Sequence, residues 1–488
     1  FASGRRGVSL TPRGGGSDMT GGSITDSVLI DLTRHMNRIH EVTGTRAVAE
    51  PGVKWLALEK ELLARGVMMP TYPASRTLAA VGGMVANNSG GEKSLAYGQT
   101  KDYVRCVRAV LADGNEYEFG PLDRKALNAK LALQDFEGEI YRKMYWLLEE
   151  HYDAIRAAKP DVSKNSSGYL LWEVWDKQTF NLAKLFCASQ GTLGIITRVT
   201  FDLVPIKPHR GMLVVFLKDL ANAGRITADL LKLGPEGLES FDDKTLSFTL
   251  RFLPDFIRIM GASNLFSLAW SFLPEFGMFL TGGVPKLVLL CEFSGASEAE
   301  VTDKLARAHE NMKRMHVKSR IARSEREMNK YWAIRRESFN VLRHHSTKKR
   351  TVPFVDDVIV KPEHMPEFLP RLQAILADYP MTLTVSGHAG NGNFHVIPLM
   401  DLSRPDAAAI IRECADRVYD LVLEFKGSIT AEHGDGLIRG PYVEKMFGAR
   451  MYGLFRRVKD IFDPDGIFNP GKKIDVDWGQ AMRNLRKN

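Results

Sequence analysis

The chain has 488 residues, of which 44% are hydrophobic and 25% charged, a balance typical of globular proteins. This length allows two or three domains of about 100–200 residues each. The net charge of +8 is mild for this size and comes without a basic tail, so the sequence gives no support for nucleic-acid binding. The four cysteines are scattered without a C-x-x-C pair, which favours a reducing, cytoplasmic compartment and argues against a disulfide framework or an iron–sulfur cluster.

The first 205 residues alternate between strand and helix patterns. Asp113-Gly114 is a turn signal between two strand-like runs, so residues 104–111 and 116–119 are predicted to form a hairpin. Further strands are expected at residues 27–32, 46–53 and 194–204, and helices at 55–65, 139–151 and 177–186.

The pattern restarts near residue 207, which predicts a second domain with its own sheet. Ser297, with Glu300 three residues later, is typical of a capping box that opens a long amphipathic helix over 298–316. The other expected strands cover 211–217, 286–293, 381–385 and 394–398, and the other expected helices cover 220–233, 369–378 and 405–425.

Residues 251–283 are unusually apolar, with only four charged side chains. Pro274 and Glu275 interrupt the run, which falls short of the ~20 apolar residues that a membrane span needs. Two interpretations stay open for this segment: a buried helical insertion, or an interfacial segment that docks on a membrane surface.

Three glycine-rich clusters punctuate the first 200 residues. Residues 11–22 hold five glycines, and Gly14-Gly15-Gly16 removes every Cβ from one turn, so backbone N–H groups can converge on an anion. The second cluster covers residues 70–91 and continues to Tyr97-Gly98; the third covers 189–196. Each cluster alone is compatible with an ordinary turn or linker, but three in this order indicate a nucleotide-binding surface. Neither a Walker loop nor a Rossmann fingerprint is present.

With these clusters, the first 205 residues resemble the flavin-binding domain of the vanillyl-alcohol-oxidase family. The resemblance implies FAD, with the first cluster at its pyrophosphate and the others along the adenine, ribose and flavin ring. Ser17 stands where covalent members often have histidine, which implies non-covalent FAD. The family's domain normally has a strand–helix unit before the loop, so we expect an N-terminally truncated domain. The implied FAD contacts are Arg13, Gly14, Gly15, Gly16, Ser17, Asp18, Gly21, Pro73, Ser75, Gly82, Gly83, Asn87, Gly90, Tyr97, Gly98, Gly191, Thr192 and Ile196.

Two further glycine-rich turns carry histidines. His388 and His395 flank a Gly-Asn-Gly-Asn turn that can direct both imidazoles to one point, and Glu432-His433 lies in a second such turn. His388, His395 and Glu432 would form a three-ligand site with open positions, suited to Zn²⁺, Mn²⁺ or Fe²⁺. The alternative is that these side chains cap turns or end helices.

These turns resemble the C-terminal domain of FAD-linked D-2-hydroxyacid dehydrogenases, which include D-lactate and D-2-hydroxyglutarate dehydrogenases and the glycolate oxidase flavin subunit. The resemblance implies that a metal, expected to be zinc or manganese, holds the substrate and that His433 takes the hydroxyl proton. It also implies that Arg335 clamps the substrate carboxylate and that Asn469 returns to the flavin. Phe339 stands where a hydroxyl residue is expected, and the expected lysine is displaced to the basic run 344–350, which weakens the case for a second carboxylate.

The sequence therefore predicts an α+β protein with a two-subdomain FAD domain over 1–206, a substrate domain with an antiparallel sheet over 207–439, and a return segment over 440–488. The predicted activity is FAD-dependent oxidation of a D-lactate-like D-2-hydroxyacid. Expected electron acceptors are a quinone, an electron-transfer flavoprotein or an iron–sulfur partner, with peripheral contact to the inner face of a membrane as a further expectation. Alternatives are D-2-hydroxyglutarate or glycolate oxidation, and a non-catalytic flavin-binding subunit. An ether-lipid alkyl transferase shares the flavin domain, but it would lack the paired histidines.

Overall fold

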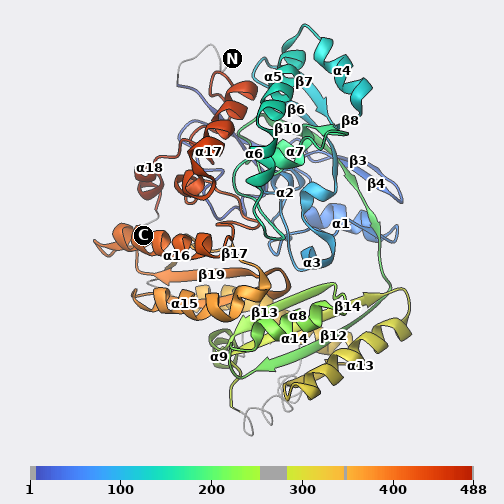
Figure 1. Cartoon of the computed structure of the whole chain (residues 1–488), viewed down its shortest axis with the longest axis vertical. Coiled ribbons are helices and arrows are strands. Elements are labelled where there is room, and N and C mark those ends of the chain that lie inside the picture. Colours follow the sequence, from blue (N-terminus) through green and yellow to red (C-terminus); the bar gives the residue numbers. More distant parts are fainter. Residues whose placement is uncertain (1–6, 253–282, 346–348, 486–488) are drawn as a thin grey trace. The chain divides into compact units, whose positions relative to one another are not determined.

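The computed structural model describes residues 7–252, 283–345 and 349–485. The chain divides into two compact units (Figure 1). The first unit comprises Phe1–Gly91, Gly98–Ile206 and Ser428–Leu485, and the second is built from Glu92–Tyr97 and Lys207–Gly427.

The first unit is built on a five-stranded sheet in the order β3-β4-β10-β6-β7. The predicted hairpin is confirmed, because β6 pairs with β7 antiparallel and Val110 lies opposite Glu116. A second, two-stranded parallel sheet joins β1 (Leu10–Arg13) to β2 (Val28–Asp31). The strands of the main sheet are β3 (Ile39–Val42), β4 (Arg46–Ala49), β6 (Val104–Val110), β7 (Glu116–Phe119) and β10 (Ile195–Asp202), and the short pairs are β5 (Val67–Met68) with β11 (Val204–Pro205) and β8 (Pro121–Leu122) with β9 (Phe180–Asn181).

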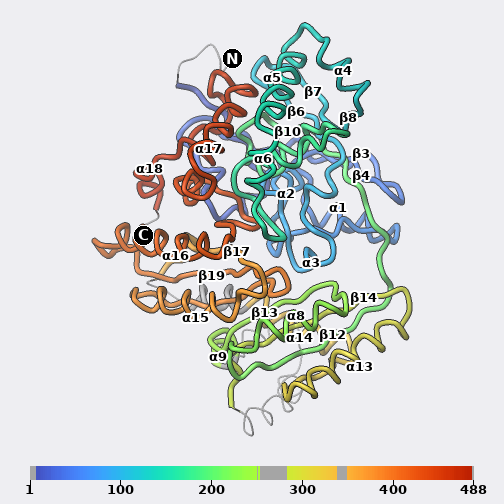
Figure 2. Tube along the Cα trace, in the orientation of Figure 1, coloured from blue at the N-terminus to red at the C-terminus, as the bar shows by residue number. Residues whose placement is uncertain are grey.

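Helices from both ends of the chain cover this unit. The C-terminal helix α17 (Val443–Phe462) packs against α5 (Phe136–Glu150), and Figure 2 shows this red segment running back among the blue and green elements of the same unit. Phe119 and Phe186 stack in the core, and Phe462 of α17 packs edge-on against Phe186. The other helices are α1 (Trp55–Leu63), α2 (Val81–Asn87), α4 (Arg124–Ala132), α6 (Tyr152–Ala157), α7 (Ala183–Phe186) and α18 (Trp478–Arg483).

The helix predicted over residues 177–186 is wrong for most of its length. The Asp176 carboxylate accepts hydrogen bonds from the backbone N–H groups of Gln178 (2.8 Å) and Thr179 (2.6 Å), which closes a turn where the helix should begin. The two-residue strand β9 follows, and only the short α7 is helical. Local side-chain bonding therefore outweighs the apolar periodicity of this segment.

The second unit contains an eight-stranded sheet in the order β15-β12-β14-β13-β18-β19-β16, with β17 paired to β19. All of its strand pairs are antiparallel, which confirms the predicted sheet type. The strands are β12 (His209–Leu217), β13 (Gly237–Asp242), β14 (Leu287–Gly295), β15 (Lys318–Ala322), β16 (Arg350–Thr351), β17 (Val358–Ile359), β18 (Thr382–His388) and β19 (Asn393–Met400).

Helices cover both faces of this sheet. On one face, α8 (Ala223–Leu231) and α13 (Glu298–Arg314) pack on alternate residues of β12 and β14, such as Leu213 and Leu289. On the other face, α9 (Asp243–Arg251) and α14 (Glu325–His345) cover the intervening residues, such as Val214 and Leu290. Strands buried on both faces explain why β12 and β14 read as nearly continuous apolar runs. The other α-helices that the structure describes in this unit are α3 (Ser94–Tyr97), α15 (Met365–Ala377) and α16 (Ala407–Glu424).

The predicted cap of α13 is confirmed in its first half. The Ser297 hydroxyl accepts a hydrogen bond from the Glu300 N–H at 3.2 Å. The Glu300 carboxylate reaches back to the Ala296 N–H at 3.0 Å rather than to that of Ser297.

The apolar segment 251–283 lies almost entirely outside the described residues, so both interpretations of it stay predictions. Among the helices that the structure describes, none combines the length and apolarity that crossing a membrane would require.

The return of the chain to the first unit starts earlier than the boundary we placed at residue 440. Ser428–Leu485 belongs to the first unit, so Glu432 and His433 group with the flavin-type unit. The physical reason is backbone hydrogen bonding: the Ser166 N–H donates to the Thr430 carbonyl at 3.1 Å, and the Ser166 hydroxyl donates to the Ala431 carbonyl at 2.9 Å.

The glycine loop between β1 and β2 packs tightly against the second glycine cluster. A Cβ added at Gly15 would lie 1.9 Å from the Leu78 carbonyl oxygen, so only glycine fits there. A Cβ added at Gly14 would lie 3.4 Å from the Gly83 nitrogen, whereas one added at Gly83 would meet nothing within 4 Å. The loop is thus fixed on one side, and Gly83 leaves open space on α2.

These two glycines give a matched pair for stability measurements. Gly15→Ala should lower the free energy of unfolding by about 1–3 kcal/mol, because the new methyl group forces the backbone apart. Gly83→Ala should leave it unchanged or raise it by about 0.5–1 kcal/mol, because alanine favours the helix. Denaturant titrations of both flavin-free variants would check this. Equal stability of the Gly15 variant and the unmodified chain would contradict the packing.

Candidate flavin cradle and metal centre

Asp18 organises the first glycine cluster. Its carboxylate accepts hydrogen bonds from the N–H groups of Thr20 (3.1 Å) and Gly22 (2.7 Å), and from the Thr20 hydroxyl (2.9 Å). The Asn87 amide at the end of α2 also donates to it, at 3.4 Å. A carboxylate that accepts from several donors fixes the loop conformation and ties the first cluster to the second.

Gln190 connects the third cluster to the other two. Its side-chain N–H donates to the Thr20 hydroxyl at 3.2 Å, and its backbone N–H donates to the Ala86 carbonyl at 2.9 Å. Its side-chain oxygen accepts from the N–H groups of Asp435 (3.0 Å) and Gly436 (2.8 Å). The three clusters therefore converge, as the sequence predicted, and one glutamine joins them.

Asn469 returns to this same place from the C-terminal segment. Residues 467–469 extend the small sheet, because the Leu10 N–H donates to the Ile467 carbonyl (2.7 Å) and the Asn469 N–H donates to the Leu10 carbonyl (2.9 Å). The Asn469 amide also donates to the carbonyls of Gly22 and Gln190, each at 2.7 Å.

The structure places the predicted flavin contacts in one unit, with one exception. Tyr97 belongs to the second unit, where its hydroxyl donates to Glu236 at 3.2 Å. Gly16, Gly21, Gly98 and Gly191 have φ between 70° and 79°, a left-handed region that favours glycine. The residues of the first unit are Arg13, Gly14, Gly15, Gly16, Ser17, Asp18, Gly21, Pro73, Ser75, Gly82, Gly83, Asn87, Gly90, Gly98, Gly191, Thr192, Ile196 and Asn469.

A buried lysine links the third glycine cluster to the C-terminal segment. Lys459 of α17 donates to the carbonyls of Thr192 (2.6 Å) and Phe468 (2.7 Å) and pairs with Asp463. Burial lowers the pKa of Lys459, while the Asp463 charge opposes the change.

A second buried lysine holds the turn that follows His433. Lys473 pairs with Asp435 at 2.6 Å, and the Asp435 carboxylate also accepts from the Ser167 hydroxyl (2.7 Å) and the Gly168 N–H (2.9 Å). Burial lowers the pKa of Lys473, while the Asp435 charge again opposes the change.

Glu432, a predicted metal ligand, has a partner that the sequence did not indicate. The Lys164 ammonium donates to its carboxylate, and both side chains are buried in the first unit. Glu432 is thus a partner of a buried ion pair as well as a candidate metal ligand.

In the second unit, the two predicted histidine ligands face each other. His388 ends β18, His395 lies in β19, and their ring centroids are 5.1 Å apart at an interplanar angle of 84°. The strand register explains this, because Ser386 lies opposite His395 and the two strands join through a tight turn with Gly392 at φ 71°. The predicted approach of the two imidazoles is observed.

Each of these histidines rests on a buried carboxylate through Nδ1. His388 Nδ1 lies 2.6 Å from Glu239 of β13, and His395 Nδ1 lies 3.2 Å from Asp356. An ionised carboxylate only accepts hydrogen bonds, so Nδ1 is the donor in each contact, and in a neutral ring this leaves Nε2 as the nitrogen that can bind a metal. A carboxylate behind a histidine is the usual arrangement for metal-ligating imidazoles, and the residues present therefore fit a divalent metal.

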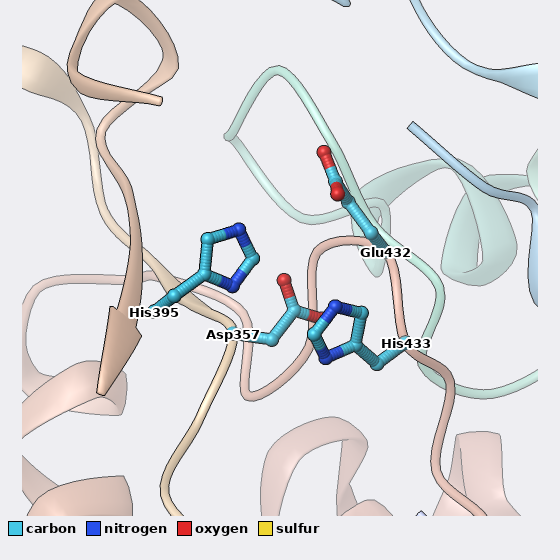
Figure 3. Close-up of side chains that lie close together, drawn as sticks. All are labelled: Asp357, His395, Glu432 and His433. Carbon is cyan, nitrogen blue, oxygen red and sulfur yellow. The ribbon is translucent and has the colours of Figure 1, made fainter. Parts of the chain in front are cut away.

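Asp357 and His433 add two candidate ligands to those predicted. An oxygen of Asp357 and a ring nitrogen of His395 lie within 4.8 Å of each other in the second unit. Ligand atoms of Glu432 and His433, successive residues of the first unit, likewise lie within 4.8 Å of each other. Figure 3 draws these four side chains. Asp357 has φ 67° and accepts from the Asn393 amide at 3.1 Å, so its backbone conformation and its side chain are both fixed.

Arg335, predicted to clamp the substrate carboxylate, lies on α14. Its guanidinium is 3.3 Å from the second oxygen of Glu239, and its side chain is only 12% exposed. The neighbouring Arg336 has other partners in the same unit. It binds Glu92 through two hydrogen bonds of 2.5 Å and stacks over Trp332.

The comparisons with known proteins agree with this architecture. Residues 206–473 match the family model of FAD linked oxidases, C-terminal domain, and residues 2–120 match the FAD binding domain. The chain belongs to the FAD-linked oxidase family, and the predicted α+β fold class is confirmed.

Named relatives are between 26% and 29% identical to this chain over the aligned residues. It is 29% identical to D-2-hydroxyglutarate dehydrogenase of Pseudomonas putida over 95% of the chain but only 45% of the relative. It is 26% identical to glycolate oxidase subunit GlcD of Bacillus subtilis, over 96% of the chain and 84% of the relative. It is also 26% identical to D-lactate dehydrogenase of Anaerostipes hadrus, over 95% of the chain and 84% of the relative. The chain thus spans about half the length of the D-2-hydroxyglutarate dehydrogenases that it matches.

Solved structures share the fold at low identity. A p-cresol methylhydroxylase superposes with a TM-score of 0.66 at 15% identity, covering 96% of this chain and 85% of the other. An alkyldihydroxyacetonephosphate synthase superposes with a TM-score of 0.64 at 16% identity, covering 95% of this chain and 72% of the other.

Sequence reasoning missed several residues of the site, for different reasons. Asp356-Asp357 directly precedes strand β17, and a carboxylate pair at a strand end could have signalled them. Gln190 lies inside the third cluster but is not a glycine. Glu239 and Lys164 carry no local signal, because their roles come from neighbours 149 and 268 positions away in sequence.

A buried carboxylate beside α14 gives a pH-dependent prediction. Burial raises the pKa of Glu292, with Lys93 opposing and Glu236 reinforcing the rise. Ionisation of Glu292 therefore costs stability as the pH rises from its unfolded pKa through its folded pKa. Glu292→Gln should raise the melting temperature at pH 8, and the gain should vanish near pH 4, because glutamine still accepts the Trp332 hydrogen bond.

Glu300→Gln is a control for which we expect the opposite pH dependence of stability. A hydrogen bond from Lys304, followed by one from the Ala296 N–H, lowers the pKa of Glu300, so its stabilising effect is present at neutral pH and lost in acid. A Glu292 variant that is less stable than the unmodified chain at pH 8 would contradict the assignment.

Proposed function

We propose that this protein oxidises a D-2-hydroxyacid, D-lactate-like in size, to the 2-oxoacid with non-covalent FAD and a divalent metal. The observation that carries the proposal is the pair of histidines, each backed through Nδ1 by a buried carboxylate, in a member of the FAD-linked oxidase family. A binding subunit without chemistry would not need this arrangement.

The flavin would be held by the first unit. The loop fixed by Asp18 and Gln190 offers backbone N–H groups to the pyrophosphate, and the open space at Gly83 leaves room for a flat ligand. FAD, when bound, supplies the acceptor for the substrate hydride. The flavin is proposed to be non-covalent, because Ser17 stands at the position of attachment and its hydroxyl group is a weaker nucleophile than a histidine ring.

The metal would be held by His388, His395 and Glu432, with Asp357 as a further candidate. A divalent metal, zinc or manganese, supplies Lewis acidity that lowers the pKa of the substrate hydroxyl. His388, His395 and Asp357 belong to the second unit, and Glu432 belongs to the first.

Two side chains of this protein act directly on the substrate in the proposal. Arg335 binds the substrate carboxylate through its planar guanidinium, which matches the two carboxylate oxygens. His433 would accept the proton of the hydroxyl oxygen on a ring nitrogen, while the hydride leaves the carbon that carries this oxygen. The proton and the electron pair thus depart to different acceptors, which balances oxidation of the alcohol to the ketone.

D-2-hydroxyglutarate is the second candidate substrate, and the 29% identity to the Pseudomonas putida relative favours it. Glycolate is a third, through the glycolate oxidase subunit. For a second carboxylate, the basic run offers Lys349, whose ammonium donates to the Thr382 hydroxyl at 2.7 Å.

The electron acceptor is proposed to be a quinone, an electron-transfer flavoprotein or an iron–sulfur partner. Peripheral membrane contact through residues 251–283 is part of this proposal. Unchanged cosedimentation with anionic vesicles after deletion of that segment would reject the membrane contact.

A dye-reduction assay with the FAD-loaded protein would test the activity. D-lactate, D-2-hydroxyglutarate and glycolate should be compared with the L-enantiomers of the first two. We expect no reduction with the two L-enantiomers, because a carboxylate clamp, a base and a hydride acceptor together would accept only one hand of a chiral substrate. The ratio of kcat/KM values names the substrate. Reduction by none of these acids would reject the proposed activity.

His433→Ala should lower kcat by about 10²–10⁴-fold, because general-base catalysis contributes about that much. The variant should retain its flavin absorbance, because the backbone around residue 433 is held by Ala431 and Asp435 rather than by the imidazole. His35→Ala, which removes an exposed imidazole, is the matched control. Full activity of the His433 variant would exclude it as the base.

A further inference from the structure

Glu239 lies in the middle of the sheet of the second unit and contacts two functional side chains at once. It belongs to β13, and only 1% of its surface is exposed. One carboxylate oxygen lies 2.6 Å from His388 Nδ1, and the other lies 3.3 Å from the Arg335 guanidinium. All three residues belong to the same unit.

A buried carboxylate at this place has a clear chemical effect on His388. The hydrogen bond fixes the imidazole tautomer and the ring orientation, and the negative charge makes Nε2 a stronger donor to a metal. The ring cannot turn away without leaving Glu239 buried with one partner fewer, and such a loss is costly for a buried charge.

The contact with Arg335 has the opposite character. The two groups form an ion pair. The positive guanidinium therefore partly cancels the effect of the Glu239 negative charge on His388. Of the described residues that surround the Arg335 Nε atom, none accepts a hydrogen bond from it. The ion pair through Nη2, at 3.3 Å, is thus the contact by which Glu239 holds Arg335.

We propose that Glu239 is a positioning residue that orients His388 for metal binding and at the same time holds Arg335 at the substrate carboxylate. One buried carboxylate would thus set the geometry of the metal centre and of the anion clamp. This inference rests on the proposed function, because it assigns to Glu239 a role at the same site.

The test measures Mn²⁺ binding by isothermal titration calorimetry to the FAD-loaded full chain after removal of metal with a chelator. Glu239→Gln keeps the size and an acceptor oxygen but removes the charge behind His388. We expect its affinity for Mn²⁺ to fall by about 10–100-fold, the usual effect of changing a group behind a metal ligand. A change of less than about threefold would overturn the inference.

Arg335→Met separates positioning from general damage to the fold. It removes the positive charge that pairs with Glu239, so the negative charge of Glu239 acts on His388 without this partial cancellation. Mn²⁺ should then bind equally well or more tightly. Damage to the fold would weaken binding in both variants alike, and that result would also overturn the inference.

Glu292→Gln is the matched control for loss of a buried carboxylate. Glu292 lies on the adjacent strand β14, and its carboxylate accepts from Trp332. It should leave Mn²⁺ affinity unchanged; a loss equal to that of Glu239→Gln would count against a specific role. If the unmodified chain binds no Mn²⁺, the metal part of the proposed function fails, whereas normal binding with an insensitive Glu239 variant rejects only the present inference.

Discussion

The side-chain amide of Asn469 is the contact on which the flavin-type unit depends. It donates to the Gly22 carbonyl of the first glycine cluster and to the Gln190 carbonyl of the third, while the adjoining backbone pairs with β1. Asn469 adopts a left-handed conformation at φ 42° to reach both. Asparagine tolerates that conformation better than most residues, and no shorter or apolar side chain could donate twice.

Buried charge supports this arrangement of glycine-rich turns, which lack side chains to pack. Lys459 holds the third cluster and the C-terminal segment, Lys473 holds the turn that follows His433, and Lys164 pairs with Glu432. Each lysine donates hydrogen bonds to buried carbonyl or carboxylate oxygens, which need a partner inside the protein. Removal of one partner would leave an uncompensated charge, so such pairs fix a single geometry even where they add little net stability. The site is thus positioned by polar contacts within a scaffold that has an ordinary apolar core.

Sequence reasoning succeeded where a pattern is local. The hairpin over residues 104–119, the cap at Ser297 and the meeting of His388 with His395 all follow from turns and periodicities within a few residues. It failed where a side chain competed with a pattern, as Asp176 did with the helix expected over 177–186. It also missed Glu239, because an acidic residue in the six-residue strand β13 gives no local sign of its partner His388, which comes from β18, the neighbouring strand. The boundary placed at residue 440 had the same cause, since the contacts of residues 428–439 lie about 265 positions earlier in the chain.

The discontinuous first unit has a consequence for biosynthesis. Its small sheet is complete only when Leu10 meets Phe468, nearly the whole length of the chain apart, whereas the second unit is assembled almost entirely from Lys207–Gly427. A ribosome therefore exposes a fully made second unit while β1, the glycine loop and the apolar face under α17 still wait for their last partners. Contacts between such distant segments form slowly, and the open surfaces are prone to aggregation in the meantime. A flavin site that includes Asn469 would therefore be complete only after residues 467–469 have been synthesised and have paired with Leu10.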